Sequence, residues 1–208
     1  MKRILCFGDS NTWGYIPSSD AERYPPTIRY PRVLQTLLGD EYEVIEEGLP
    51  GRTMMTDDLK EMVGNRNGSL EFGMVVYSTL PLDYILIMLG SNDLKYIYPD
   101  TARKCAESLE KDYIYKVEQK LAGKIKNAPK IIIVAPSVVG DGYQKVSKEV
   151  IEESKYFNKE YQKIALKHGC LFVDNIGLET GSDFIHLTEK SHLLLAEKIY
   201  KAIKDYES

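Results

Sequence analysis

The feature that most constrains the fold is a repeating pattern, in which short apolar runs alternate with longer amphipathic stretches. Each apolar run has the length of a strand that is buried on both faces, and the longer stretches place apolar residues at helical spacing. Strands separated by helices predict a parallel sheet with helices packed on both faces and right-handed crossovers. The predicted strands are residues 4–7, 42–46, 84–89, 131–135 and 171–173.

Capping residues mark where the predicted helices begin and end. Residues 31–38 predict a short helix, with proline in its first turn and glycine directly after it. Two longer helices are expected over residues 101–126 and 146–168, and a last helix follows Thr188 as its N-cap. Residues 54–80 predict only broken helix and loop, because glycines interrupt the pattern.

Composition excludes several classes of protein. The 208 residues suit one domain, 1–208, and a net charge of −4 gives no basic surface for nucleic acid. No apolar run has the length of a membrane span, and the run after the basic N-terminus is too short for an export signal. Cys6, Cys105 and Cys170 are far apart and are expected to be reduced and buried. We therefore expect a soluble, cytoplasmic protein, and its oligomeric state, a homo-oligomer included, stays open.

The first predicted strand stops abruptly at Gly8-Asp9-Ser10-Asn11. Open α/β folds bind ligands at the carboxyl ends of their parallel strands, so Ser10 is a candidate nucleophile. The alternative is that these small polar residues form an ordinary turn or helix cap. A second loop of the same kind, Gly90-Ser91-Asn92-Asp93, follows another predicted strand and favours the functional interpretation.

A serine nucleophile needs a base, and Asp183 and His186 offer a candidate pair directly before the last helix. An imidazole can take the hydroxyl proton of Ser10, while the neighbouring carboxylate fixes the tautomer of the ring. The alternatives are a His186 ring bonded to backbone and an Asp183 carboxylate in solvent. A metal site is not expected, because there is no His-Glu-x-x-His, and His186 and His192 do not share a helix face.

Acyl transfer also requires hydrogen-bond donors for the oxyanion, and the loops after the strands can supply them. Asn92 offers a side-chain amide, Gly51 an unobstructed backbone N–H, and Ser10 its own backbone N–H. For Gly51, and for Gly48 in the same loop, the alternative is a turn that requires positive φ. The Gly-x-Ser-x-Gly elbow of the larger α/β hydrolases is absent, because Thr12 stands where its second glycine would be.

Together these motifs resemble those of the SGNH (GDSL-type) hydrolases. The loops that carry Ser10, Gly51 and Asn92, and the pair Asp183-x-x-His186, occur in the order and approximate spacing of that family. The resemblance implies a flavodoxin-like, three-layer α/β/α sandwich with a parallel sheet of five strands. It also implies Ser10, Asp183 and His186 as catalytic residues, and Ser10, Gly51 and Asn92 as the oxyanion hole.

Finer details are similar to the arylesterase and acyltransferase branch, which acts on short acyl esters. They are Phe-Gly-Asp-Ser-Asn-Thr-Trp-Gly at 7–14, Gly-Leu-Pro-Gly-Arg-Thr at 48–53 and Pro-Leu-Asp at 81–83. Segments 54–80 and 136–146 match nothing in that pattern, and we expect them to shape the acyl and alcohol pockets.

Aromatic and apolar residues near these motifs are candidates for the wall of a substrate pocket. They are Trp13, Phe184 and Ile185, with Tyr96 and Tyr98 as further candidates, and packing in the core is the alternative for each. No cofactor is expected.

The expected function is that of a serine esterase that cleaves short-chain acyl esters, acetyl esters above all, through an acyl-serine intermediate. Its partner is then a small-molecule ester. Two other functions stay open. One is a non-catalytic module that binds a carbohydrate or another small molecule. The other is a flavodoxin-like binder of phosphate or flavin, in which the loop after the first strand holds the anion.

Overall fold

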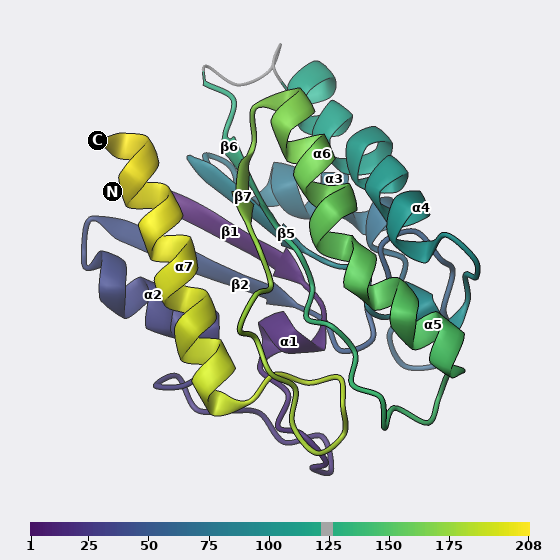
Figure 1. Ribbon diagram of the computed structural model, residues 1–208. Coiled ribbons are helices and arrows are strands. Elements are labelled where there is room, and N and C mark those ends of the chain that lie inside the picture. The colour runs from purple at the N-terminus through teal and green to yellow at the C-terminus, as the bar shows by residue number, and fades with distance from the viewer. Residues whose placement is uncertain (122–126) are drawn as a thin grey trace.

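Five parallel strands form one sheet in the computed structural model, which describes residues 1–121 and 127–208 (Figure 1). The strands are β1 Lys2–Gly8, β2 Tyr42–Gly48, β5 Tyr84–Met88, β6 Lys130–Val134 and β7 Leu171–Val173. Their order is β2-β1-β5-β6-β7, and every neighbouring pair is parallel. Counted in chain order this is 2-1-3-4-5, the flavodoxin-like arrangement, so the predicted fold class and strands are confirmed.

Helices cover both faces of the sheet, which makes three layers (Figure 1). On one face lie α2 Tyr30–Leu38 and α7 Glu189–Glu207. The other face carries α3 Gly68–Thr79, α4 Thr101–Ser108, α5 Lys148–Glu153 and α6 Phe157–His168. A single-turn helix, α1 Ser10–Trp13, follows β1 at the edge of the sheet. Every described helix is too short or too polar to cross a membrane.

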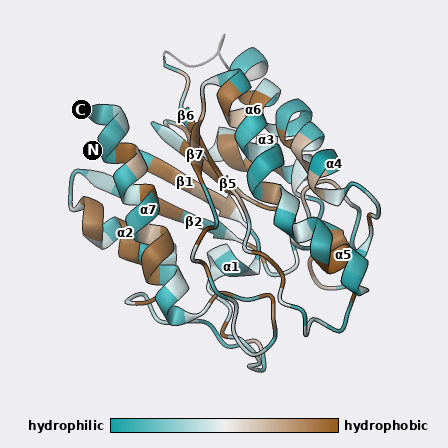
Figure 2. Cartoon of the chain, viewed as in Figure 1, coloured by the Kyte–Doolittle hydropathy of each residue, from teal (hydrophilic) through white to brown (hydrophobic). Residues whose placement is uncertain are grey.

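The central strands are hydrophobic in sequence (Figure 2). Their side chains alternate between two cores, one under each helical layer. In β1, Leu5 and Phe7 face the α3–α6 layer, whereas Ile4 and Cys6 face the α2–α7 layer. Each of these four side chains has no exposed surface. Burial on both faces explains why the strands are continuous apolar runs, and each large side chain contributes about 1.5–3 kcal/mol.

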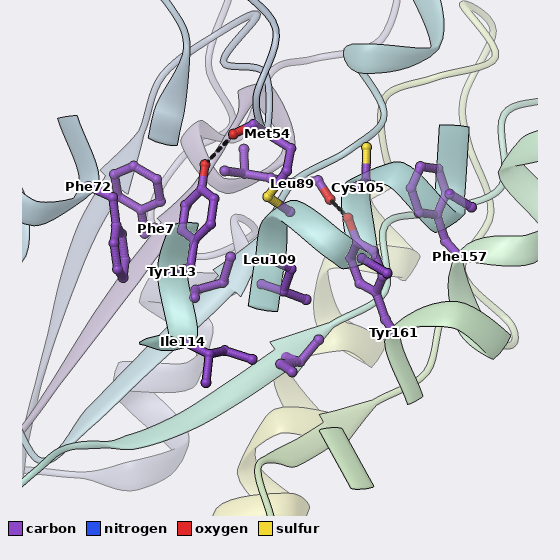
Figure 3. Packing of buried hydrophobic residues seen from close by; sticks show 14 of the residues in the cluster. Phe7, Met54, Phe72, Leu89, Cys105, Leu109, Tyr113, Ile114, Phe157 and Tyr161 are labelled. Carbon is purple, nitrogen blue, oxygen red and sulfur yellow. Dashed lines mark hydrogen bonds between the residues drawn. The ribbon is translucent and has the colours of Figure 1, made fainter. Parts of the chain in front are cut away.

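Tyrosines complete the core under α3–α6 and keep their hydroxyls bonded (Figure 3). Phe7 packs edge-on against Phe72, with ring centroids 5.2 Å apart. The Tyr113 hydroxyl donates to the Met54 carbonyl at 2.5 Å, and the Tyr161 hydroxyl donates to the Leu89 carbonyl at 2.8 Å. A buried tyrosine with a bonded hydroxyl is a stable core residue, because no polar group is left unpaired. These bonds also attach two loops to the core: the loop that contains Met54 and the loop that begins at Leu89, directly after β5.

The helix predictions are confirmed in part. The first and last helices begin as expected, and the Thr188 side chain accepts from the Ser191 N–H as the N-cap of α7. The predicted helix 101–126 starts as α4 and continues as π-helical turns Leu109–Ile114 and Lys116–Leu121, and its last residues, 122–126, lie outside the described residues. The predicted helix 146–168 divides into α5, a 3₁₀ turn at Ser154–Tyr156, and α6.

Segment 54–80 is more ordered than its sequence indicates. It contains a small antiparallel hairpin, β3 Leu59–Lys60 with β4 Gly64–Asn65, and then helix α3. Gly73 lies inside α3, where glycine costs about 1 kcal/mol relative to alanine. Phe72 and Val76 on the same helix are fully buried, so tertiary packing offsets the low propensity.

Two glycines allow α1 to lie directly on the ends of β1 and β2. Gly8 and Gly48 are partners in the parallel register. A Cβ on Gly8 would stand 2.0 Å from Thr12 Oγ1, and one on Gly48 would stand 2.2 Å from the Trp13 nitrogen. Gly48 is therefore needed because α1 approaches its backbone closely. The alternative of a turn with positive φ is wrong for Gly48 and correct for Gly51, which has a φ of 81°.

Glu207, at the end of α7, ties that helix to the first residues of three strands. It accepts hydrogen bonds of 2.6 Å from the hydroxyls of Tyr42 and Tyr84, and it pairs with Lys2 at 2.7 Å. Burial raises the pKa of Glu207, but the bonds from Lys2, Tyr42 and Tyr84 outweigh this effect and bring the pKa to about 2.

Replacing Glu207 with Gln should lower the free energy of unfolding by about 1–2 kcal/mol at pH 7. A carboxyl group whose pKa is depressed by folding stabilises the fold above its ordinary pKa of 4.5, and that contribution is lost as the pH falls towards 2. The difference between wild type and E207Q in urea denaturation should therefore shrink over this range. Glu197→Gln, at an exposed position of α7, is the matched control. Equal stability of E207Q and wild type at pH 7 would contradict the role given to this carboxylate.

Candidate active site

The candidate site lies at the carboxyl edge of the sheet, between the loops that follow β1 and β5. These strands are neighbours, with Gly8 paired to Met88. The chain leaves β1 towards α2 on one face and leaves β5 towards α4 on the other. Open α/β sheets bind ligands at such a switch point. It brings the Ser10 and Asn92 loops together although their sequences are far apart.

The turn after β1 presents Ser10 as the first residue of α1. Asp9 caps this single helical turn, because its carboxylate accepts from the Asn11 N–H at 2.9 Å. The helix ends at Gly14, which has the left-handed conformation. The alternative of a helix cap is thus correct for Asp9. The Ser10 side chain is not used in the cap. Among the described residues no acceptor is bonded to the backbone N–H of Ser10, which leaves it available to a ligand.

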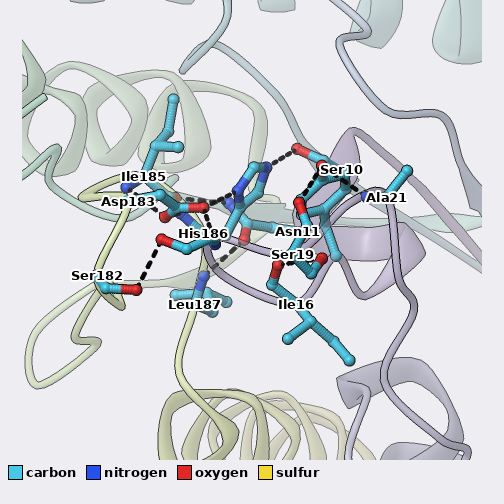
Figure 4. A network of polar contacts seen from close by, with 12 residues as sticks. Ser10, Asn11, Ile16, Ser19, Ala21, Ser182, Asp183, Ile185, His186 and Leu187 are labelled. Carbon is cyan, nitrogen blue, oxygen red and sulfur yellow. Dashed lines mark hydrogen bonds and ion pairs between the residues drawn. The ribbon is translucent and has the colours of Figure 1, made fainter. Parts of the chain in front are cut away.

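Ser10, His186 and Asp183 form a continuous chain of hydrogen bonds (Figure 4). The Ser10 Oγ lies 2.9 Å from His186 Nε2, and His186 Nδ1 lies 2.6 Å from Asp183 Oδ2. The backbone N–H groups of His186 and Ser18 also donate to Asp183, at 3.0 and 3.1 Å. These bonds hold the carboxylate in place, so that Nδ1–H donates to it and Nε2 is left to accept the serine proton.

Burial and the Asp183 carboxylate act in opposite directions on His186. Burial lowers the pKa of His186, and Asp183 only partly restores it, so the ring is neutral at pH 7. For Asp183 the effect of burial is opposite, because burial raises the pKa of a carboxyl group. Hydrogen bonds from His186 outweigh this effect, so the net change lowers the pKa of Asp183. The Tyr15 ring stacks on His186 with centroids 4.3 Å apart. The pair is therefore a neutral base held beside an ionised acid.

Asn11 joins the two ends of the chain at the site. Its Oδ1 accepts from the Leu187 N–H at 2.9 Å, and its Nδ2 donates to the Ile185 carbonyl at 3.3 Å. These two bonds bracket His186 from both sides in sequence. Because Asn11 follows Ser10 directly, the same residue fixes the distance between the hydroxyl and the imidazole.

The Gly51 loop is held by two buried charged residues, Arg52 and Asp93, of which Arg52 lies next to Gly51 in the chain. Arg52 donates to the backbone carbonyls of Glu47 and Gly8, the latter at 2.7 Å. Its guanidinium also forms an ion pair with Glu71 at 3.0 Å and lies 4.1 Å from the centre of the Phe7 ring. In this way it connects the ends of β1 and β2 to α3. Among the described residues the backbone N–H of Gly51 has no acceptor, so it too can serve a ligand.

Asp93 fastens the next residues of that loop to the end of β5. Its carboxylate accepts from the backbone N–H groups of Met54, at 2.6 Å, and Met55, at 3.1 Å, and from the Thr56 hydroxyl at 2.9 Å. Burial raises the pKa of Asp93, and these three donors lower it in part. Asn92, which precedes it, donates from Nδ2 to the Arg52 carbonyl at 3.0 Å. The three predicted oxyanion donors are thus on loops that are bonded to one another.

A pocket of about 420 Å³ opens beside His186. Phe184 and Ile185 line it as expected from the sequence, and residues 142–145 contribute from the loop after β6. Phe184 has a φ of 64°, a strained value for a non-glycine residue, and its ring lies where a Cβ on Gly142 would be. The wall on the α1 side is Tyr15. Trp13 lies elsewhere: its ring packs near Tyr15 and under the guanidinium of Arg23, at 5.3 Å.

The remaining predicted wall residues are at the surface. Tyr96 and Tyr98 are about half exposed and do not line this pocket. Segment 54–80 does not line it either; instead, Arg66 donates to the Pro50 carbonyl at 3.0 Å and pairs with Asp58, which supports the Gly51 loop. Within the described ranges, no group of three or more His, Cys, Asp or Glu side chains could hold a metal ion.

Sequence reasoning missed Tyr15 and the structural roles of Asn11, Arg52 and Asp93. Three of these residues lie inside motifs that had been singled out, so their position was a usable signal. Their partners, however, are distant in the chain and depend on strand order. Nothing in the sequence marks Tyr15 as a neighbour of His186.

Comparison with known proteins agrees with this geometry. A family model described as "GDSL-like Lipase/Acylhydrolase family" matches residues 6–194. The chain therefore belongs to the GDSL-like lipase/acylhydrolase family, a family of carboxylic ester hydrolases.

Three relatives illustrate the likeness. The chain is 27% identical to an acetylxylan esterase from Xylanibacter ruminicola over 97% of its own length, but it spans only 43% of that relative. A carbohydrate acetylesterase structure from Sinorhizobium meliloti is 32% identical, has a TM-score of 0.87, and covers 99% of this chain and 100% of its own. The inhibitor-bound aryl esterase of M. smegmatis is 30% identical, with a TM-score of 0.87 and 99% of each chain covered.

Replacing Asn11 with Ala should destabilise the protein by about 1–3 kcal/mol, because the buried Leu187 N–H then has no acceptor. Chemical denaturation at pH 7 measures this. Ser182→Ala is the control on the same terminal loop. Within the described part of the chain its hydroxyl bonds only the exposed Ser18 hydroxyl, so a change below about 0.5 kcal/mol is expected. If both variants unfold at the wild-type denaturant concentration, Asn11 does not hold the loop.

Proposed function

We propose that this chain is a serine esterase that hydrolyses short-chain acyl esters, acetyl esters above all, through an acyl-enzyme on Ser10. The observation that carries the proposal is the hydrogen-bonded chain Ser10–His186–Asp183, with distances of 2.9 and 2.6 Å. This is the geometry that a weak hydroxyl nucleophile requires: a base within reach, and a third group that orients the base. Membership of a family of carboxylic ester hydrolases supports the same conclusion.

In the first half-reaction the Ser10 Oγ attacks the ester carbonyl carbon while His186 Nε2 takes its proton. The resulting imidazolium is stabilised by the Asp183 carboxylate, which stays ionised. When the tetrahedral intermediate collapses, His186 returns the proton to the departing alcohol, and the acyl group remains on Ser10. In the second half-reaction His186 removes a proton from water, or from an acceptor alcohol, which attacks the acyl-serine and releases the acyl group.

The oxyanion of each intermediate is placed against three donors: the backbone N–H groups of Ser10 and Gly51, and the side-chain amide of Asn92. Each donor of this kind contributes roughly a hundred- to a thousand-fold in rate. The buried contacts of Arg52 and Asp93 hold the loops that carry these donors, so little reorganisation is needed when charge develops. The positive φ of Gly51 orients its peptide group in a way that other residues would resist.

The pocket beside His186 supports a sugar or an aryl group as the alcohol part of the substrate. Tyr15, Tyr143 and Phe184 present ring surface there, and Ser18 and Ser182 supply hydroxyls. A pocket lined by both rings and hydroxyls suits a flat, hydroxylated or aromatic ligand. The acetylxylan esterase, the carbohydrate acetylesterase and the aryl esterase among the relatives support acetylated carbohydrates and aryl acetates as the substrates to try.

Replacing Ser10 with Ala should reduce the turnover of p-nitrophenyl acetate by at least about a thousand-fold, because the variant lacks the hydroxyl on which the proposed acyl-enzyme forms. The thermal unfolding curve should stay close to that of wild type, because only one hydroxyl is removed. Ser78→Ala removes an exposed hydroxyl on α3, outside the lining of the pocket, and should keep turnover within a few-fold. Turnover by a folded S10A at the wild-type rate would refute the proposal.

The pH dependence should report His186 as the base. Burial lowers the pKa of His186, so kcat/KM should fall with decreasing pH around a midpoint below 6.5. Asp9, with a pKa raised by burial to about 6, titrates in the same range. Asp183→Asn separates the two, because loss of this carboxylate lowers the pKa of His186 further.

The D183N midpoint should therefore move to lower pH, with kcat reduced on the order of 10³- to 10⁴-fold. The measurement is the rate of p-nitrophenyl acetate hydrolysis from pH 4.5 to 8. A midpoint that does not move in D183N would assign the titration to another group, and would remove the support that this profile gives to His186.

A further inference from the structure

The side chain of Lys95 lies against the predicted oxyanion donor, outside the Ser10–His186–Asp183 chain. Lys95 ends the 3₁₀ turn Asp93–Lys95 that follows the Asn92 loop. Its ammonium group donates to Asn92 Oδ1 at 2.7 Å. The side chain is half-buried, and among the described residues it forms no ion pair with a carboxylate. A partly desolvated ammonium group without a carboxylate partner costs folding free energy. A role in the function of the site would explain why the chain carries it here.

The contact determines which end of the Asn92 amide faces the site. With Oδ1 held by the ammonium, Nδ2 points to the Arg52 carbonyl at 3.0 Å, and its second hydrogen is left for a ligand. Rotation of the amide by half a turn would place NH₂ against the ammonium group and the oxygen against a carbonyl. Both contacts would be repulsive, so Lys95 and Arg52 together select the donor orientation.

The ammonium group also strengthens the donor. The positive charge of Lys95, bonded to Oδ1, polarises the Asn92 amide, and a polarised amide is a better hydrogen-bond donor at its nitrogen. In addition, the charge lies one side chain away from where the oxyanion develops, so it can stabilise the negative charge of the transition state.

We propose that Lys95 is a positioning residue of the oxyanion hole, which holds Asn92 with its N–H towards the reacting carbonyl and supplies positive charge behind it. This rests on the proposed function of Ser10 and goes beyond it, because it assigns part of the transition-state stabilisation to a side chain that does not touch the substrate.

Charged groups from four other segments face Lys95. The carboxylates of Asp9 and Asp58 favour its charged form, and the cations Lys145 and Arg66 oppose it. His186 faces the same region, because Lys95 lowers its pKa. The strongest effect is burial, and the net result is that the pKa of Lys95 is lowered to about 8. The ammonium is thus intact at neutral pH and is lost in the mildly alkaline range.

The test compares Lys95→Met, Lys95→Arg and Lys104→Met in the hydrolysis of p-nitrophenyl acetate between pH 5.5 and 9.5, with the spontaneous rate subtracted. Lys104 is the matched control, since it also donates one hydrogen bond to a neutral oxygen, the Pro99 carbonyl, away from the site. K95M should lose about 10- to 100-fold in kcat at pH 7 with KM within about three-fold, because only transition-state binding is affected. K104M should match wild type.

The pH profile distinguishes positioning from a purely structural role. Wild-type kcat should decline above about pH 8, as the ammonium loses its proton. K95R keeps a charge that does not titrate, so it should recover most of the rate and show no decline up to pH 9.5. A wild-type kcat in folded K95M, or the same alkaline decline in K95R as in wild type, would overturn the proposal. Neither result would affect the role of Ser10, which S10A tests separately.

Discussion

The site depends on the side chain of Asn11, which bonds the backbone on both sides of His186 while its neighbour in sequence is Ser10. A nucleophile and a base that lie at opposite ends of a chain need a rigid connection, because a misplacement of about 1 Å can cost a hundred-fold in rate. The sheet supplies the coarse placement through the end of β1. The amide of Asn11 supplies the fine placement, because its nitrogen and its oxygen each form a buried hydrogen bond to the backbone beside His186.

The other half of the site is built from charges that are taken out of water and satisfied individually. Arg52 and Asp93 are almost completely buried, and each is matched by carbonyls, backbone N–H groups or an acid. Such groups stabilise a fold only when every bond is made, so they hold their loops in a single conformation. In the function we propose, the consequence is that the predicted oxyanion donors are aligned before a substrate arrives. Lys95, in our proposal, extends this arrangement by one further bond.

The pocket follows from the same architecture. The loop after β6 reaches the terminal loop through Phe184, whose ring lies against Gly140 and Gly142. The Gly140 N–H donates to the Phe184 carbonyl at 2.8 Å, so the two loops form one wall. The strained φ of Phe184 is held by this contact and places its ring at the pocket rather than in the core.

The sheet and the motifs could be predicted from sequence, because each depends on local pattern. Continuous apolar runs revealed the five strands, and strand ends marked the loops that carry Ser10, Asn92 and His186. Helix α3 was missed because Gly73 lowers its helix propensity, which only the tertiary burial of Phe72 offsets. Side-chain direction was also out of reach: the packing of Trp13 against Arg23, which leaves Tyr15 beside His186, depends on how α1 ends.

The most direct test of the central claim is to identify the residue that forms the covalent intermediate. Wild-type protein treated with a serine-directed fluorophosphonate, digested and analysed by tandem mass spectrometry, should carry the phosphonyl adduct on the peptide that contains Ser10, with loss of esterase activity in proportion to labelling. Full inactivation with the adduct on a different residue, or no adduct on an enzyme that turns over its ester, would contradict the assignment of Ser10 as the nucleophile.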